Sequence, residues 1–181
     1  MRFVETPLPG AFVIEPEPHR DERGLFARTF CGREFTARGL HCSFVQCSTS
    51  YNRLRGTLRG MHWQVGPHAE AKLVRCTTGA IFDVILDLRP GSRTRGRFAT
   101  ALLDAETRRM LYVPEGFAHG FQTLEDGSEV FYQMSAAFEP AAARGFRFDD
   151  PALRLPWPLP PSCVSARDRA LPALDLEAAR V

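Results

Sequence analysis

Four parts of the sequence hold side chains suited to moving protons or holding negative charge. They are the cluster Arg59–Gln64 followed by Lys72–Val74, the cluster Pro114–Phe121, the segment Ser165–Asp168, and Tyr132 on a strand of its own. Imidazole titrates near neutral pH, an ammonium group is a compact positive charge, and a phenol can donate a proton. Singly, each side chain is more simply explained as a core, cap or surface residue. Only their joint occurrence favours a site for acid–base chemistry.

A metal site is the first alternative for these clusters. Pro114–Phe121 contains Pro-x-Gly-x-x-His, a tight turn that leads into a strand beginning at His119. The first cluster offers His62-x-Gln64, so a His-x-His pair is incomplete, and the nearest carboxylate is Glu70. A first-row metal usually takes about three strong protein ligands, and these residues form a weak set. We therefore expect no metal and no other cofactor.

The cysteines favour a reduced compartment. Their number is odd and no Cys-x-x-Cys spacing occurs among Cys31, Cys42, Cys47, Cys76 and Cys163. Neither a zinc site nor a disulfide framework fits this pattern. The N-terminus lacks a signal segment, and no apolar run approaches the roughly 18–20 residues of a membrane span. We therefore expect a cytoplasmic protein with no membrane partner.

Length and charge are typical of one globular domain. The chain has 181 residues, 44% of them hydrophobic and 24% charged, and we expect a single domain over residues 1–181. An N-terminal arm over about residues 1–20 and a C-terminal wrap over about residues 151–181 would complete it. The net charge of +2 is too balanced for a nucleic-acid-binding protein. Lys72 is the only lysine among 23 basic residues, which draws attention to it.

Short apolar stretches separated by Gly, Pro and Asp predict the elements that must position these residues. Their spacing of roughly 8–15 residues favours an all-β sandwich or barrel with short helical trim. The predicted strands are Ala11–Glu15, Ser43–Ser50, Leu73–Thr77, Ile81–Leu88, Phe98–Leu103, Met110–Val113, His119–Leu124 and Glu129–Ser135.

Helical signals are few. Arg33–Arg38 is predicted to be a short helix ended by Gly39, and Asp175–Arg180 a terminal helical turn. The segment Pro151–Pro161 contains five prolines, so it predicts an extended wrap over the domain surface.

Several motifs, in order, resemble one known family. The motifs are Asp21–Phe26, Val45-Gln46 with Ser50, Leu58–Gln64, Ala71–Val74, Asp83–Arg89, Ser92, Pro114–Phe121, Phe131-Tyr132, Asp149–Pro151, Trp157-Pro158 and Ser165-x-x-Asp168. From about Val13 to Pro172 the sequence resembles the dTDP-4-dehydrorhamnose 3,5-epimerases, which act on 4-keto-6-deoxyhexoses linked to a nucleotide. The resemblance implies a cupin-like jelly roll, a homodimer with an exchanged N-terminal segment, and chemistry without a metal.

The implied reaction needs a base, a cation and an acid. Inverting C3 or C5 of a 4-keto sugar removes a proton beside the carbonyl and leaves an enolate. His62 suits the base and Lys72 the cation, and Tyr132 suits the acid on the opposite face. The resemblance places Asp168 beside His62, where a carboxylate would orient the ring. Spacing alone does not give that pair, because 106 positions separate the two residues.

The substrate also carries a pyrophosphate. Arg59 is a planar bidentate donor suited to phosphate oxygens. The resemblance adds Arg23, Gln46 and His119 to the nucleotide or phosphate side, with Arg23 entering from the partner subunit. Phe26 is expected to pack in the core and is also grouped with the substrate-binding residues.

Departures from the family pattern gather on the nucleotide side. His19 stands where the family commonly has Phe, Arg28 where it has Glu, Ser48 where it has Asn, and Phe138 where it has Tyr. The nucleobase therefore stays open among dTDP, CDP and GDP, and so does inversion at C3, C5 or both. The final sugar and its pathway are equally open.

Two other functions compete with the epimerase. One is a metal-dependent cupin enzyme, which would need near-stoichiometric metal for activity. The other is a non-catalytic protein that binds a sugar nucleotide. Exchange of a substrate hydrogen with heavy water would separate the epimerase from this binder.

Overall fold

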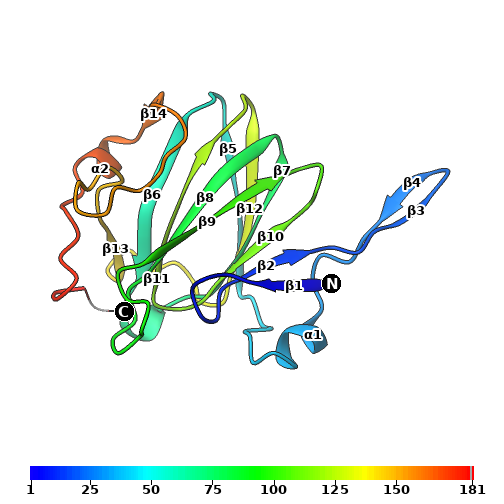
Figure 1. Cartoon of the computed structure of the whole chain (residues 1–181), viewed down its shortest axis with the longest axis horizontal. Coiled ribbons are helices and arrows are strands. Elements are labelled where there is room, and N and C mark those ends of the chain that lie inside the picture. Colours follow the sequence, from blue (N-terminus) through cyan, green and yellow to red (C-terminus); the bar gives the residue numbers. More distant parts are fainter. Residues whose placement is uncertain (180) are drawn as a thin grey trace.

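The structure is a computed structural model in which residues 1–179 and 181 are described. Two antiparallel sheets face each other, and a thin hairpin extends away from them (Figure 1). The strands are β1 (Arg2–Glu5), β2 (Phe12–Glu15), β3 (His19–Asp21), β4 (Gly24–Phe26), β5 (Gln46–Asn52), β6 (Thr57–Gln64), β7 (Lys72–Thr78), β8 (Ala80–Asp87), β9 (Phe98–Asp104), β10 (Met110–Val113), β11 (Phe117–Thr123), β12 (Ser128–Met134), β13 (Ala143–Gly145) and β14 (Cys163–Val164). The helices are α1 (Gly32–Thr36), the 3-10 helix η1 (Gly66–His68) and α2 (Ala166–Arg169).

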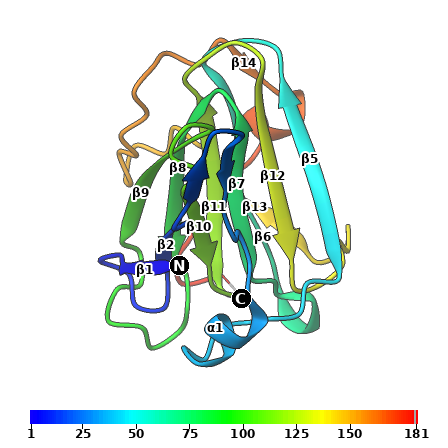
Figure 2. The same cartoon turned by 90° about the vertical axis from the view of Figure 1, so that its right-hand side faces the viewer.

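The strand order is that of a jelly-roll sandwich. The first sheet runs β1-β2-β10-β7-β12-β5, and Figure 2 shows β5 at its free edge. The second runs β13-β6-β11-β8-β9, with β14 parallel to β6. The predicted all-β, cupin-like class is confirmed by this architecture and by the solved structures reported below.

The core between the sheets comes from alternating side chains. Val74 and Val130 of the first sheet pack with Ile81, Ile85 and Phe121 of the second, and all of them are buried. Successive residues of a strand point to opposite faces, so each strand lends one face to this core.

The outer face of the second sheet is also covered. Val84 and Leu86 point away from the central core and pack with Phe146, Leu155 and other residues of the C-terminal segment. The proline-rich stretch 151–161, which is described throughout, contains neither helix nor strand, as predicted. A turn occupies residues 176–178 in the predicted helical turn Asp175–Arg180, and Arg180 lies outside the described residues.

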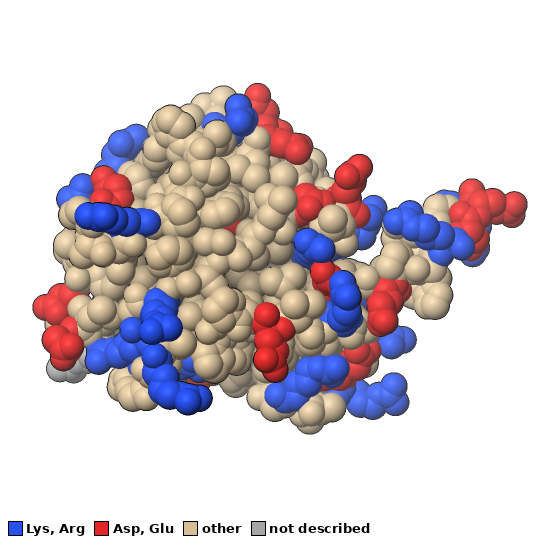
Figure 3. All heavy atoms as spheres, in the orientation of Figure 1, with Lys and Arg blue, Asp and Glu red and all other residues tan. Residues whose placement is uncertain are grey.

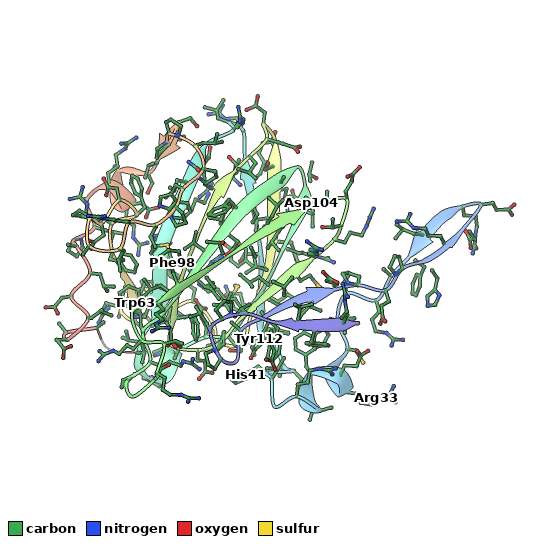
Figure 4. The ribbon with its side chains drawn as sticks, viewed as in Figure 1. Arg33, His41, Trp63, Phe98, Asp104 and Tyr112 are labelled. Carbon is green, nitrogen blue, oxygen red and sulfur yellow. The ribbon has the colours of Figure 1, made fainter. Side chains whose placement is uncertain are left out.

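An aromatic cluster closes the outer face of the first sheet. Phe35 of α1 is fully buried and contacts Phe3, Phe30 and Tyr112 edge-on or tilted. Figure 4 shows Tyr112 beside His41, whose backbone N–H donates to the tyrosine hydroxyl at 3.1 Å. The predicted helix Arg33–Arg38 is observed as Gly32–Thr36 plus a turn. Gly39, at φ +68°, takes the left-handed conformation expected where a helix ends.

The projecting part of the N-terminal region is the β3–β4 hairpin, residues 19–26. Residues of β1 and β2 instead pair within the first sheet. The hairpin carries charges of both signs, as Figure 3 shows. Phe26 is 73% exposed, so the prediction that it packs in the core of its own chain is wrong. Its apolar ring sits on a two-stranded ribbon that has no second layer to cover it.

Several short elements were not predicted: β1, β3, β4, β13, β14 and α2. The important omission is β6, because it carries Arg59 and His62. The predicted strand Ser43–Ser50 is observed at Gln46–Asn52. Among the described residues, no helix is long and apolar enough to cross a membrane.

Asp87 should stabilise the fold at neutral pH and lose this contribution at acid pH. Its buried carboxylate accepts hydrogen bonds from Arg89, Ser92 and Thr94. Burial disfavours the charged form, but these donors outweigh burial and lower the pKa of Asp87 to about 2 from 3.8. Their contribution is complete above the unfolded pKa and is lost as pH falls through the folded one.

Asp87→Asn should therefore lower the free energy of unfolding at pH 7 by on the order of 2 kcal/mol. Urea unfolding at pH 7 and at pH 3 measures this loss. The gap between wild type and variant should narrow at pH 3, and an equal gap at both pH values would contradict the argument.

Candidate active site

One end of the sandwich holds a cavity of about 580 Å³. Its lining includes six of the predicted residues, of which five come from strands β6, β7, β11 and β12 and the sixth is Asp168 of α2. The lining consists of Thr49, Ser50, Tyr51, Arg59, His62, Lys72, His119, Phe121, Tyr132, Ser165, Arg167 and Asp168. A second cavity of about 310 Å³ shares His62, Lys72, Tyr132 and Arg167 with it. These shared side chains therefore stand at the boundary between the two cavities.

A β-bulge places Arg59 and His62 on the same face of β6. Residues three apart in a regular strand face opposite ways. Here His119 pairs with His62 while Phe121 pairs with Arg59, so β6 has one more residue than β11 between the pairs. The extra residue reverses the alternation, and both side chains reach the cavity.

Gly60 makes this bulge possible. Its φ is +135°, a conformation that residues with a side chain rarely adopt. A Cβ at this position would lie 2.6 Å from the Cα of Gly120 on the neighbouring strand. The two glycines therefore let β6 and β11 approach closely beneath the cavity.

His62 and Asp168 form a hydrogen-bonded pair. The distance from His62 Nε2 to Asp168 Oδ1 is 2.7 Å, and the other carboxylate oxygen lies 3.4 Å from the Gly60 backbone nitrogen. Ser165 caps α2 by accepting from the Asp168 backbone N–H at 3.0 Å. The cap fixes the first turn of α2, which leaves the Asp168 side chain free to face the imidazole.

The pKa values of two groups suit proton transfer. Burial alone would raise the pKa of Asp168, but the hydrogen bond and charge of His62 hold it below its ordinary value. Asp168 is therefore a carboxylate acceptor, and His62 Nε2 carries the donated proton. Burial raises the pKa of Tyr132, and the charge of Glu70 adds to this while Arg59 opposes it. The phenol therefore stays protonated at neutral pH.

Lys72 lies at the start of β7 with its ammonium in the cavity. Its Nζ is 3.0 Å from Glu70 Oε1, and its side chain is 13% exposed. The charge is thus largely withdrawn from water and fixed in place.

A second histidine–carboxylate pair joins His119 of the cavity lining to a buried aspartate behind it. His119 Nε2 is 2.9 Å from Asp83 on the adjacent strand β8. Burial raises the pKa of Asp83, whereas the charges of His119 and Lys72 oppose that rise. Asp83 was not predicted as a site residue, because it interrupts an apolar strand that otherwise indicates core.

The remaining predicted binding residues divide between two places. Arg59 Nε donates to Asn52 Oδ1 at 2.8 Å in the first cavity, and Gln46 lines the second. Arg23 and Phe26 lie on the projecting hairpin, outside both linings, and Arg23 pairs with Asp21 at 2.6 Å.

Arg167 lines both cavities and was not predicted. The sequence feature that could have indicated Arg167 as a site residue is its position directly before Asp168 in the Ser165–Asp168 motif. The family departures lie in two separate groups: Ser48 and Phe138 line the second cavity, whereas His19 and Arg28 lie near the base of the hairpin.

Within the described residues, no group of three or more His, Cys, Asp or Glu is arranged to hold a metal. The three residues weighed as ligands have other partners. His62 and His119 bond to aspartates, and Glu70 bonds to Lys72 and Gln64.

The fold and the cavity define a class: a cupin-like enzyme whose side chains can move a proton beside a stabilised negative charge. The family model for dTDP-4-dehydrorhamnose 3,5-epimerase matches residues 5–175. The chain therefore belongs to the dTDP-4-dehydrorhamnose 3,5-epimerase family, and the predicted resemblance is confirmed.

Similar proteins agree with this assignment. The dTDP-4-dehydrorhamnose 3,5-epimerase of Methanothermobacter thermautotrophicus is 44% identical over 158 residues, covering 87% of this chain and 84% of its own. The structure of the Bacillus anthracis enzyme with TDP and PPi bound has a TM-score of 0.92 at 38% identity, covering 96% of this chain and 99% of its own. The structure of the Legionella pneumophila 3,5-epimerase in complex with dTDP-4-keto-L-rhamnose has a TM-score of 0.90 at 32% identity. The match covers 98% of this chain and 93% of the Legionella chain.

These comparisons confirm the predicted activity at the level of the reaction. The protein is an isomerase of deoxysugar biosynthesis that epimerises a nucleotide-linked 4-keto-6-deoxyhexose.

Proposed function

We propose that His62 is the base that removes the proton from C3 or C5 of the sugar. Its bond to the Asp168 carboxylate supports this role, because that bond leaves the other ring nitrogen unprotonated. The electrons of the broken C–H bond move to the C4 carbonyl, which becomes an enolate. Asp168 stabilises the imidazolium that forms.

Lys72 holds the enolate oxygen, and Tyr132 returns a proton to the opposite face. The ammonium stands at the boundary of the two cavities, close to both His62 and Tyr132 in the shared lining. A raised pKa keeps the phenol in its donating form. When Tyr132 protonates the carbon, the enolate collapses to the ketone with inverted configuration.

The pyrophosphate binds the basic side of the cavity. Arg59 and Arg167 supply guanidinium donors, and His119 with Gln46 extends the polar lining toward the nucleotide. This set keeps three of the predicted binding residues, Arg59, His119 and Gln46, and adds Arg167. The substrate class proposed for this chain is a nucleoside-diphosphate sugar, and the cytoplasm is the proposed location.

The observation that most strongly supports this function is that the His62–Asp168 pair, Lys72 and Tyr132 all line one cavity. A panel of 4-keto-6-deoxy sugars linked to dTDP, CDP or GDP, incubated in heavy water and followed by proton NMR, tests it. We expect deuterium at C3, C5 or both with at least one nucleotide. Binding without any exchange would instead support the non-catalytic alternative.

The protein acts as a homodimer in which the hairpin completes the partner's site. Arg23 and Phe26 lie outside the cavities of their own chain, on a projecting ribbon with an exposed aromatic ring. The face of the first sheet also presents Tyr51, 60% exposed, and Phe131, which packs under Arg75. Both features suit a second copy of the chain.

Mixed dimers should reveal the exchange. Arg23→Ala has a damaged hairpin and an intact cavity, and His62→Ala has the reverse. If the hairpin acts in trans, refolding the two inactive variants together forms hybrid dimers with one complete site and restores about a quarter of wild-type activity, since about half the dimers are hybrids. No recovery would contradict the exchange of the hairpin, and a monomer by sedimentation at micromolar concentration would contradict the dimer itself.

A further inference from the structure

Glu70 lies on the short connection between η1 and β7, two residues before Lys72. Its Oε1 is 3.0 Å from Lys72 Nζ, and its side chain is only 8% exposed. Both partners are therefore largely withdrawn from solvent, where a charged pair is screened less than at the surface. Glu70 lines the second cavity together with Lys72 and Tyr132.

A buried glutamine holds the other oxygen of Glu70. Gln64 Nε2 lies 3.2 Å from Glu70 Oε2 and also contacts the backbone oxygens of His68 and Ala137. Gln64 Oε1 accepts from the Glu139 backbone N–H at 2.6 Å. The amide is thus fixed from both ends, and it fixes the carboxylate in turn. Gln64 is the residue that stands where a metal-binding His-x-His pair would have its second histidine.

We propose that Glu70, supported by Gln64, is a positioning residue that holds the Lys72 ammonium at the boundary of the two cavities. A lysine side chain has four flexible carbons, so its charge needs an anchor to sit at one point. Glu70 accepts that charge on one oxygen and is itself held through the other. This inference rests on the proposed role of Lys72 as the cation for the enolate.

The charges around Lys72 support the arrangement. Burial raises the pKa values of Asp83 and Tyr132; the charge of Lys72 opposes the rise at Asp83, and the charge of Glu70 adds to the rise at Tyr132. Glu70 therefore faces the cation and the acid of the reaction together.

Glu70→Gln tests the proposal with little change in volume. In the wild-type protein, two donors, Lys72 Nζ and Gln64 Nε2, each approach one oxygen of the Glu70 carboxylate. An amide has one oxygen and one NH₂ group, so one donor must meet another donor and the anchor is lost. We expect kcat to fall roughly 10- to 100-fold while KM changes less than about threefold, because a displaced cation mainly harms the charged transition state.

A double-mutant cycle separates positioning from a structural effect. In a Lys72→Ala background, Glu70→Gln should cause little further loss, because its effect acts through the lysine. Equal losses in both backgrounds, or a single variant within about twofold of wild-type kcat, would overturn the proposal. Glu70→Ala repeats the test without placing an N–H against Gln64, should Glu70→Gln fail to fold.

The control is Glu15→Gln, which removes a carboxylate paired with Arg2 and Arg109 away from the cavities. It should leave kcat unchanged. Lys72→Ala separates a failure of the proposed role of Lys72 from a failure of the proposed role of Glu70. If it retains full activity, the proposed role of Lys72 fails; if it loses activity while Glu70→Gln does not, only the role of Glu70 fails.

Discussion

Replacing His62 by alanine should abolish exchange of the sugar's hydrogen with solvent while leaving the protein folded. General-base catalysis by a positioned imidazole contributes about 10²- to 10⁴-fold, and we expect a loss of that size. The side chain is 37% exposed to the cavity, so its removal leaves no sealed void in the core. Proton NMR in heavy water measures the exchange, and thermal unfolding checks the fold.

His41→Ala is the matched control for this variant. It also removes an imidazole paired with a carboxylate, here Glu115 at 2.9 Å, but outside the cavity lining. Its exchange rate should equal that of wild type. Near-normal exchange in a folded His62→Ala protein would contradict the proposed role of His62 and would assign proton removal to another group.

Much of the sandwich could be predicted from alternation. Strands β8 and β12 follow a regular period of two, and their apolar residues lie where that period places them. Strand β6 could not be predicted in this way, because its bulge at Gly60 breaks the period and its Arg59 and His62 are polar. The residues best suited to chemistry thus occupy the strand whose pattern is least regular.

The candidate site shows a similar division. Residue types alone suggested His62, Lys72 and Tyr132, and the family resemblance was needed to place Asp168 beside His62. Only the fold shows that His119 pairs with Asp83. The apolar strand around Asp83 predicts a core position rather than a site residue.

Hairpin residues posed a different problem. The family resemblance grouped Arg23 and Phe26 with the substrate and had Arg23 enter from the partner subunit, and the fold puts both residues outside the cavities of their own chain. Residue types alone do not show whether such residues serve their own chain or another, because that depends on how far the β3–β4 hairpin projects from the sheets.

Replacing Tyr132 by phenylalanine should separate the two halves of the reaction. Proton removal uses His62, Asp168 and Lys72, and the loss of one hydroxyl alters none of them. Returning a proton from the opposite face needs a donor, and phenylalanine has none. The ring volume is conserved, so Val130 and Met134 on the same strand should keep their packing.

The variant should still exchange substrate hydrogen with heavy water, with the proton returning to its original face. Net inversion should fall by roughly 10²-fold or more, much further than exchange. Parallel measurement of deuterium content and product configuration by NMR distinguishes the outcomes. Equal falls would mean that Tyr132 acts in binding or in both steps. Unchanged inversion would give the proton to another donor, and Tyr132 would then be a half-buried strand residue that packs against the core between the sheets.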